Sequence, residues 1–246
     1  MQTTERINYI KNWILNYCKS MPKEADTLVV GISGGIDSAV TSTICALTEK
    51  KTIVLSMPIK QIKEQQDLSL KHQEWLKDKF KNVESHLVNL DQVFQSFKTS
   101  LNEFKNEHGL ANSRARLRMV ALYQVATSNN GIVVGTGNKV EDFGVGFYTK
   151  YGDGGVDISP IADCTKSQVW EMGKNLGILE EIVNTQPTDG LWDDGRTDVK
   201  QLGMSYVELE EAMKNSSDKN HKKYLEIRKR NLHKMNPVPV CKMKDD

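Results

Sequence analysis

The chain has 246 residues with 33 basic and 32 acidic side chains, so its formal net charge is +1. This near-zero charge excludes the broad basic field that grips a nucleic-acid backbone, and we expect no nucleic-acid partner. Hydrophobic residues make up 38% of the chain and charged residues 26%, which is ordinary for a globular protein with a large core.

The N-terminal segment carries charge throughout and lacks the apolar stretch of a signal peptide. Its apolar residues Ile7, Ile10, Ile14 and Tyr17 recur at helical spacing, which predicts an amphipathic surface helix. No apolar run reaches the roughly 18 residues that a membrane-spanning helix needs, so we expect no membrane partner. The four cysteines lie far apart without a CxxC pair, which argues against disulfides or zinc and fits a cytoplasmic location.

Short β-branched runs alternate with longer helical stretches in the first 137 residues. We expect strands at 27–32, 52–57, 85–90 and 131–137, and helices at 37–49, up to about 80, 91–106 and 113–128. Apolar runs without in/out alternation, separated by helices, predict an α/β fold with a parallel twisted sheet covered by helices on both faces.

The character of the chain changes after residue 137. Residues 144–155 hold five glycines and are expected to form a loop, followed by a helix at 166–176. Residues 186–203 are polar and contain glycine, which indicates a mobile segment, and 205–232 reads as a helical tail. With no repeat and no convincing boundary, we expect a single domain over residues 1–246.

The most informative stretch is GISGGIDS, residues 31–38, which follows an expected strand and opens an expected helix. Gly34 and Gly35 permit backbone conformations closed to other residues and leave room for a ligand. Exposed backbone amides at the start of a helix form an anion site, so the loop predicts phosphate binding, with Ser33 and Ser38 adding hydroxyl donors. The alternative is a simple strand-to-helix turn in which Asp37 and Ser38 cap the helix.

Two other phosphate loops are excluded by their spacing. A Walker A loop needs a lysine after its last glycine, and a Rossmann fingerprint needs GxGxxG; neither pattern occurs here. Asp37 inside the loop would repel a bare phosphate. A Mg²⁺ ion between the two would remove this conflict, since Mg²⁺ favours one or two carboxylates plus phosphate oxygens.

A second polar cluster follows the last expected strand, at residues 135–166. Thr136 comes directly after that strand, where α/β sheets place ligand contacts. Glu141 is a second carboxylate that could share a metal with Asp37, and Lys150 and Lys166 could contact phosphate. Two further acids in this cluster could accept hydrogen bonds from ribose or amide groups: Asp153 and Asp157.

The SGGxDS string resembles the pyrophosphate-binding loop of N-type ATP pyrophosphatases, which cleave ATP to AMP and pyrophosphate. Within that group the chain resembles the ammonia-dependent NAD synthetase family. The strings that carry this resemblance are TKYGDGGVDISP, ANSRARLRM (residues 111–119), QPTDGLW (residues 186–192) and the pair His233–Lys234. The resemblance implies a Rossmann-like fold of the adenine nucleotide alpha hydrolase type.

The resemblance also implies a role for individual residues. Asp37, Glu141 and Lys166 correspond to catalytic positions, and Asp37 and Glu141 to the Mg²⁺ ligands. The implied ATP contacts are Gly31, Ile32, Ser33, Gly34, Gly35, Ile36, Asp37, Ser38, Thr136, Lys166 and Thr188. The implied deamido-NAD contacts are Arg116, Lys150, Asp157, His233 and Lys234, with Arg114 and Arg118 close by on the same helix as Arg116.

The implied activity is the amidation of deamido-NAD to NAD with ATP and ammonia, through an adenylate, with release of AMP and pyrophosphate. Ammonia is expected because 246 residues leave no room for the amidase domain of glutamine-using relatives. The resemblance implies a homodimer, for which Trp13 and other aromatic side chains could serve. Two alternatives stay open: another amidating or tRNA-modifying ATP pyrophosphatase, and a nucleotide-binding regulator without turnover.

Overall fold

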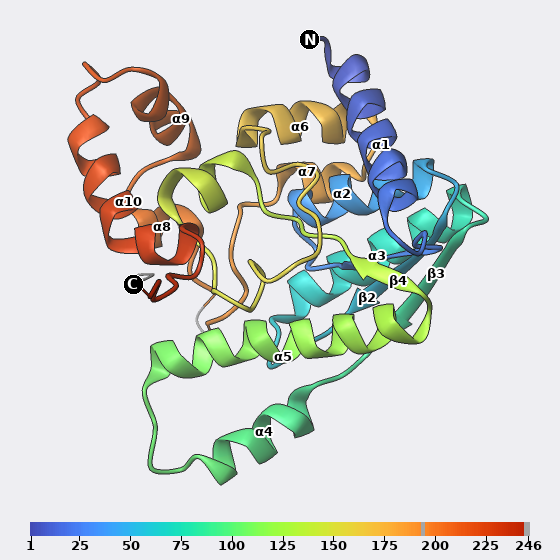
Figure 1. The fold of residues 1–246 in the computed structure, drawn as a ribbon, viewed down its shortest axis with the longest axis horizontal. Helices are drawn as coiled ribbons and strands as arrows, with labels where there is room; N and C mark the ends of the chain where they lie inside the picture. Colours follow the sequence, from blue (N-terminus) through green and yellow to red (C-terminus); the bar gives the residue numbers. More distant parts are fainter. Residues whose placement is uncertain (193–194, 244–246) are drawn as a thin grey trace.

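The computed structural model describes residues 1–192 and 195–243 (Figure 1). A four-stranded parallel sheet lies at its centre in the order β3-β2-β1-β4. The strands are β1 (Thr27–Gly31), β2 (Lys51–Ser56), β3 (Val83–Leu87) and β4 (Gly131–Val133). Because β1 pairs with β2 on one side and with β4 on the other, the chain reverses its winding direction between β1 and β4. Ligands of open α/β sheets bind at such a reversal, beyond the carboxyl ends of the strands.

Successive residues of the buried strands point to opposite faces of the sheet. Leu28 and Val30 of β1 pack into one hydrophobic cluster, whereas Val29 packs into another with Ile53 and Leu55 of β2. Helices α1, α2, α3 and α6 cover the first face, and α4 and α5 cover the second (Figure 1). Their bounds are α1 (Thr3–Ser20), α2 (Ile36–Leu47), α3 (Lys63–Lys79), α4 (Asp91–Ser100), α5 (Glu107–Ser128) and α6 (Lys166–Asn175).

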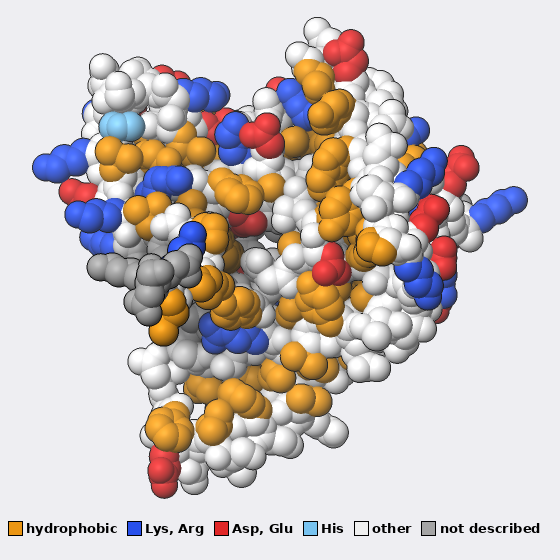
Figure 2. Space-filling view, viewed as in Figure 1, with side chains coloured by type: hydrophobic (Ala, Val, Ile, Leu, Met, Phe, Trp, Pro, Cys, Tyr) orange, Lys and Arg blue, Asp and Glu red, His pale blue; other side chains and the backbone are white. Residues whose placement is uncertain are grey.

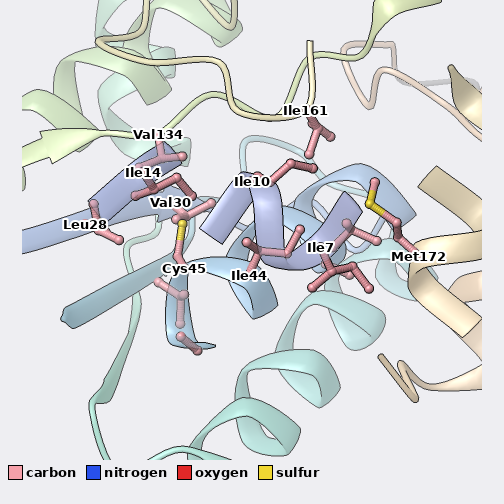
Figure 3. Packing of buried hydrophobic residues seen from close by; sticks show 14 of the residues in the cluster. Ile7, Ile10, Ile14, Leu28, Val30, Ile44, Cys45, Val134, Ile161 and Met172 are labelled. Carbon is pink, nitrogen blue, oxygen red and sulfur yellow. The ribbon is translucent and has the colours of Figure 1, made fainter. Parts of the chain in front are cut away.

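The hydrophobic core on the first face of the sheet packs α1 against α2, the helix that follows the glycine loop. Figure 3 shows Ile7, Ile10 and Ile14 of α1 lying close to Ile44 and Cys45 of α2. The side chains of Ile14 and Ile44 are fully buried, and burying one such side chain stabilises the fold by about 1.5–3 kcal/mol. This packing holds α2, whose N-terminus faces the expected phosphate site, in a fixed place against the sheet.

The C-terminal part of the chain forms a separate group of elements beside the sheet (Figure 1). A third hydrophobic cluster joins the π-helix η1 to α9 and α10 through Val140, Val145, Leu209 and Tyr224. The elements of this region are η1 (Lys139–Val145), α7 (Glu180–Asn184), α8 (Asp198–Leu202), α9 (Tyr206–Lys214) and α10 (His221–Met235). Among the described residues, no helix combines the length and apolarity needed to cross a bilayer.

The expected α/β fold with a parallel sheet is confirmed, and the strands expected at 27–32 and 52–57 and the helices expected at 37–49, up to about 80 and at 166–176 agree with the structure to within two residues. Other bounds were wrong: the strand expected at 85–90 is Val83–Leu87, the helix expected at 91–106 ends at Ser100, and the helical tail expected at 205–232 is two helices, α9 and α10. Asn106 caps α5 by accepting a hydrogen bond from Gly109 N (2.9 Å), so this helix begins six residues earlier than expected. The last strand ends at Val133, and the π-helix was not foreseen. Tyr17 was predicted to face inward, but Cys18 takes that place and Tyr17 is exposed.

A buried histidine makes the stability of the loop's support depend on pH. His72 of α3 is fully buried, and its Nε2 lies 3.1 Å from Ser42 Oγ of α2. Burial lowers the pKa of His72 to about 4, below its ordinary value of 6.5. Because the unfolded chain binds a proton on this histidine more readily than the folded chain does, the free energy of unfolding decreases as the pH falls from 6.5 toward 4. The loss caused by His72 alone is about 3 kcal/mol.

We therefore expect the free energy of unfolding, measured by urea titration, to decrease between pH 7 and pH 4. The variant His72→Gln keeps a nitrogen near Ser42 but does not titrate. Its stability should change less over the same range, so that the two curves converge at acid pH. Parallel curves for the two proteins would contradict the assignment.

Candidate active site

A pocket opens beyond the carboxyl ends of β1 and β4, at the reversal of the sheet. Its walls come from the glycine loop, the start of α3, one face of α5, the η1 region, Lys166 of α6 and residues 185–191. Figure 2 shows this side of the molecule hollowed between the group α8–α10 and the rest, with acidic side chains near the centre of the hollow. The pocket therefore lies where the fold class predicts ligand binding.

The glycine loop is held in shape by its own serines and by α3. Ser33 Oγ and Ser38 Oγ lie 3.1 Å apart, Ser33 Oγ accepts from Gly35 N (3.2 Å), and Ser38 Oγ donates to Gly35 O (3.0 Å). From α3, Ser69 Oγ donates to Ile32 O at 2.9 Å. Gly35 caps α2, so the positive end of this helix and the loop amides face the pocket.

The conformation of Gly34 is closed to other residues. Its φ is +90°, and a Cβ built at this position would lie 2.5 Å from Gln65 O of α3. We expect Gly34→Ala to lower the free energy of unfolding by about 2–3 kcal/mol, because left-handed backbone and backbone contact both oppose a side chain. Gly35→Ala is the matched control: its Cβ would meet only Ser33 Oγ at 3.4 Å, so urea titration should show a smaller loss. Equal losses for the two variants would contradict this explanation.

A buried ammonium group joins the two expected metal ligands. Lys166 Nζ lies 2.5 Å from Asp37 Oδ2 and 2.9 Å from Glu141 Oε1, and the lysine is 1% exposed. Asp37 stands at the start of α2, Glu141 in η1 and Lys166 at the start of α6. The fold thus brings together, within one ion-pair cluster, three residues separated by up to 129 positions in the sequence.

The electrostatics of this cluster favour the charged forms of Lys166 and Glu141, whereas burial raises the pKa of Asp37 against the opposing effect of Lys166. Burial by itself would lower the pKa of Lys166, but the carboxylates of Asp37 and Glu141 raise it well above its ordinary value. Burial works to raise the pKa of Glu141, yet Lys166 and the Tyr206 hydroxyl outweigh it, and the pKa falls. An ammonium ion between two carboxylates is stable here because each charge has a close partner.

Several polar side chains at the site escaped the sequence analysis. Asn138 donates to Asp37 Oδ1 (3.0 Å) and accepts from the backbone amides of Val140 and Glu141, so it both caps η1 and orients Asp37. Tyr206 Oη donates to Glu141 and lies 2.7 Å from Asp198 Oδ2. Burial raises the pKa of Asp198 to about 7. An Asn at the start of a helical turn is a recognisable cap signal, but nothing local in the sequence marks Asp198 or Tyr206.

All the residues expected to contact ATP line the pocket, from Gly31 to Ser38 and at Thr136, Lys166 and Thr188. Thr188 Oγ1 donates to Arg196 O (3.0 Å), which shapes the 185–191 wall. Arg118 also lines the pocket, where its guanidinium donates to Met57 O (3.0 Å) and Gln61 Oε1 (2.8 Å). Arg118 is thus the arginine of α5 that faces this pocket, two positions from the arginine singled out in the sequence.

The residues expected to contact deamido-NAD lie elsewhere, around a shallow second pocket on the neighbouring face of α5. Arg116 lines that pocket with Tyr123 and Tyr151, and Met119 lines both pockets. Two of the other expected contacts lie close to Arg116 and Tyr123: Lys150 O accepts from Arg116 Nε (3.2 Å), and Asp157 Oδ1 accepts from Tyr123 Oη (3.0 Å). The lysine side chains bind backbone carbonyl groups: Lys150 Nζ donates to His233 O (3.4 Å), and Lys234 Nζ donates to Tyr148 O (2.8 Å). None of these five lines the first pocket in the described part of the chain.

The donor set suits a magnesium ion. Asp37 and Glu141 already share one cation, the Lys166 ammonium, so their oxygens converge on one point. Among the described residues no three His, Cys, Asp or Glu side chains gather into a complete metal site. Two carboxylates with the remaining positions left to phosphate and water is the arrangement that Mg²⁺ prefers. Three further acids line the pocket, Asp142, Asp153 and Asp189, and their ionised forms would add to the need for a cation before a polyphosphate can bind.

Comparison with known proteins agrees with this geometry. Residues 6–245 match the NAD synthase family. The NH3-dependent NAD(+) synthetase of Methanosarcina acetivorans is 37% identical over 213 residues, which are 83% of this chain and 80% of the relative. The NMN synthetase structure from Francisella tularensis superposes with a TM-score of 0.90 at 32% identity, covering 99% of this chain and 100% of that one. The NH3-dependent NAD synthetase from Campylobacter jejuni, at 24% identity, shares the fold with a TM-score of 0.79, covering 98% of this chain and 100% of that one. Because the family model spans residues 6–245 and a relative 37% identical covers 83% of the chain, the chain belongs to the NAD synthase family.

Proposed function

We propose that this protein is an ammonia-dependent NAD synthetase, which amidates deamido-NAD to NAD with ATP and releases AMP and pyrophosphate. The observation that carries the proposal is the meeting of Asp37, Glu141 and Lys166 at the mouth of the glycine loop. In a nucleotide pocket of this family, that cluster supplies the charges that transfer of an adenylyl group to a carboxylate requires.

In the first step a carboxylate oxygen of the nicotinate ring attacks the α-phosphorus of ATP. A new P–O bond forms while the bond to the bridging β-oxygen breaks, and the electron pair leaves with pyrophosphate. Both partners are anions, so the site has to neutralise phosphate charge and align the carboxylate. The loop amides, the N-terminus of α2 and the guanidinium of Arg118 are placed to hold the phosphates. The Lys166 ammonium is placed to offset charge that develops on the leaving group.

A magnesium ion held by Asp37 and Glu141 would supply further charge neutralisation at the phosphates. In the second step the nitrogen of ammonia attacks the carbonyl carbon of the adenylate. The C–N bond forms, the C–O bond to AMP breaks, and the nitrogen loses one proton. Water would hydrolyse the adenylate, so the site has to exclude water during the reaction. We expect two parts of the pocket lining to do so: residues 185–191, and the side chains of Gln61, Gln65 and Gln66.

The arrangement of the two pockets supports a dinucleotide substrate. Because Met119 of α5 belongs to both pockets, a long ligand passing this side chain would reach from one to the other. We propose that Arg116 and Lys150 contact its phosphates, and that Asp157, His233 and Lys234 complete the deamido-NAD site. In the structure His233 is exposed and Lys234 is bound to Tyr148 O, so both contacts require local rearrangement.

A second candidate substrate is the mononucleotide. The observation that favours it is the TM-score of 0.90, at 32% identity and nearly full coverage, with the Francisella NMN synthetase. The chemistry of both amidations is the same, and the acceptors differ only in the adenylate half beyond the nicotinate ribose phosphate. Discrimination therefore depends on whether the second pocket binds that half.

The experiment that tests the proposal is an amidation assay with purified protein, Mg-ATP and ammonium chloride. Deamido-NAD and nicotinate mononucleotide are supplied in parallel, with glutamine replacing ammonium in separate reactions. NAD formation at the higher kcat/KM supports the dinucleotide, and preferential NMN formation supports the second candidate. Pyrophosphate release without either product would mean a different acceptor, as in the tRNA-modifying alternative. ATP binding without pyrophosphate would favour the nucleotide-binding regulator.

We also infer a cytoplasmic homodimer. Val120 of α5 is 66% exposed and lines the second pocket beside Arg116, so a partner subunit packed on this face would enclose the proposed dinucleotide site. Light scattering should report a dimer that Val120→Glu weakens, whereas Val207→Glu, at an equally exposed valine of α9, should not. A monomeric wild type would overturn the dimer.

The free thiols of Cys18, Cys45 and Cys164 are buried, which fits a reducing compartment.

A further inference from the structure

Tyr206, the first residue of α9, connects the metal-site acid Glu141 to a pocket wall distant in sequence. The side chain is 3% exposed, and its hydroxyl donates to Glu141 Oε1 of η1. The same hydroxyl lies 2.7 Å from Asp198 Oδ2 at the start of α8. Three elements of the C-terminal half therefore meet at one phenol oxygen.

Counting protons defines how these three groups are bonded. Two short contacts between oxygen atoms need two protons, and a phenol supplies only one. If Tyr206 donates to Glu141, the second proton belongs to Asp198, whose carboxylic acid donates to Tyr206 Oη. Asp198 then donates to Tyr206, and Tyr206 donates to the Glu141 carboxylate, which only accepts.

The two hydrogen bonds to Glu141 converge on one oxygen. Lys166 Nζ donates to Glu141 Oε1 (2.9 Å), and Tyr206 Oη donates to the same atom. The terminal torsion of a glutamate side chain is intrinsically broad, and these two donors restrict the orientation of the carboxylate. If Lys166 turns toward phosphate, Tyr206 is the donor that keeps Glu141 in place.

Asp198 links this bond to the wall of the nucleotide pocket. Its backbone amide donates to Pro187 O (3.1 Å), and its carboxyl group lines the pocket. Gln201 of the same short helix donates to Asp189 Oδ2 at 3.0 Å. Asp198 and Gln201 therefore connect the 185–191 wall to Tyr206.

We propose that Tyr206 is a positioning residue, whose hydroxyl orients Glu141 for sharing a cation with Asp37 and couples that orientation to the 185–191 wall through Asp198. The inference rests on the proposed function for its reaction, but its central claim concerns divalent-cation affinity. Groups that orient a metal-binding carboxylate typically contribute 10- to 100-fold to affinity or activity.

The substitution Tyr206→Phe isolates the hydroxyl. The ring is retained, and with it the contact beneath Lys166 Nζ (4.6 Å to the centroid) and the edge contact with Trp170 (6.0 Å between centroids). We expect Mn²⁺ affinity to fall about tenfold, measured by electron paramagnetic resonance of free Mn²⁺ with α,β-methylene-ATP present. The Mg²⁺ concentration for half-maximal pyrophosphate release should rise by the same factor, with kcat at saturating Mg²⁺ within about threefold of wild type.

Tyr224→Phe is the matched control, because Tyr224 is the other buried tyrosine of the same hydrophobic cluster. This variant should keep both the Mn²⁺ affinity and the Mg²⁺ dependence of the wild type. If Tyr206→Phe lowers only the melting temperature, as a purely structural hydroxyl would, the proposal is overturned. If the wild type amidates neither acceptor but Tyr206→Phe still loses Mn²⁺ affinity, the proposed function fails and the positioning role stands.

Asp198 provides a second test that does not depend on the first variant. An asparagine at this position can donate an amide hydrogen to Tyr206 Oη, so Asp198→Asn should stay within about threefold of wild-type Mn²⁺ affinity. Asp198→Leu cannot, and should lose as much affinity as Tyr206→Phe. The double variant Tyr206→Phe/Asp198→Leu should be no worse than either single change, because both break one connected unit. Additive losses would contradict the coupling.

Discussion

Asp37→Asn is expected to reduce ATP-dependent pyrophosphate release by at least about 1000-fold, and Asp37→Ala to abolish it. Transition-state charge stabilisation of this kind is worth about 4 kcal/mol per group. The asparagine preserves size but removes one of the two charges that meet at Lys166, so the cation site is left with Glu141 alone. Pyrophosphate release should be measured at saturating Mg-ATP with each acceptor.

Folding and chemistry can be separated for this variant. With one carboxylate neutral, Glu141 and Lys166 still form a balanced buried pair, so we expect the free energy of unfolding to change little. Asp163→Asn is the matched control, since Asp163 is an exposed acid paired with Lys139 at the surface. Near-normal pyrophosphate release by Asp37→Asn would refute the metal assignment.

Lys166→Met should affect both stability and activity. Its removal leaves the carboxylates of Asp37 and Glu141 buried, facing each other and without their shared cation. Breaking a buried ion pair in this way costs about 3–5 kcal/mol. We expect urea titration at pH 7 to show a loss of this size, and pyrophosphate release to fall by at least about 100-fold.

The variant also provides a direct reading of the cation site. Because a divalent cation can replace the ammonium charge, millimolar Mg²⁺ should restore part of the lost stability of Lys166→Met while changing the wild type less. Lys139→Met, at a surface lysine paired with Asp163, should show neither the loss nor the rescue. A stable Lys166→Met protein that ignores Mg²⁺ would mean that the two acids do not form a cation site.

These expectations connect stability and function through the same few contacts. The α2 helix is packed by the core of the first face and braced by α3, where Ser69 donates to Ile32 O and Gln65 fits against Gly34. Protonation of His72 between α2 and α3 is therefore expected to loosen the glycine loop at acid pH.

The order of elements and the glycine loop between β1 and α2 could be predicted from the sequence because both depend on local patterns. Buried strands such as Leu28–Val30 are unbroken apolar runs, and Gly34 and Gly35 between such a strand and a helix have few alternative roles. The residues expected at the ATP site follow these elements directly, and they all line one pocket. Features of this kind can be predicted because hydrophobic periodicity and the backbone freedom of glycine act over only a few residues.

The tertiary structure alone decided which distant side chains meet. Tyr206 and Asp198 reach Glu141 only because α8 and α9 fold back onto η1. No residue spacing within α8 or α9 predicts that contact. Arg118 rather than Arg116 lines the first pocket because of the way α5 is rotated about its axis against the sheet. Apolar and polar residues are mixed around this helix, so its sequence does not predict that rotation. The sequence determined the fold and the chemistry of the loop, because those depend on local backbone preference. Packing between elements decided how the charges are held.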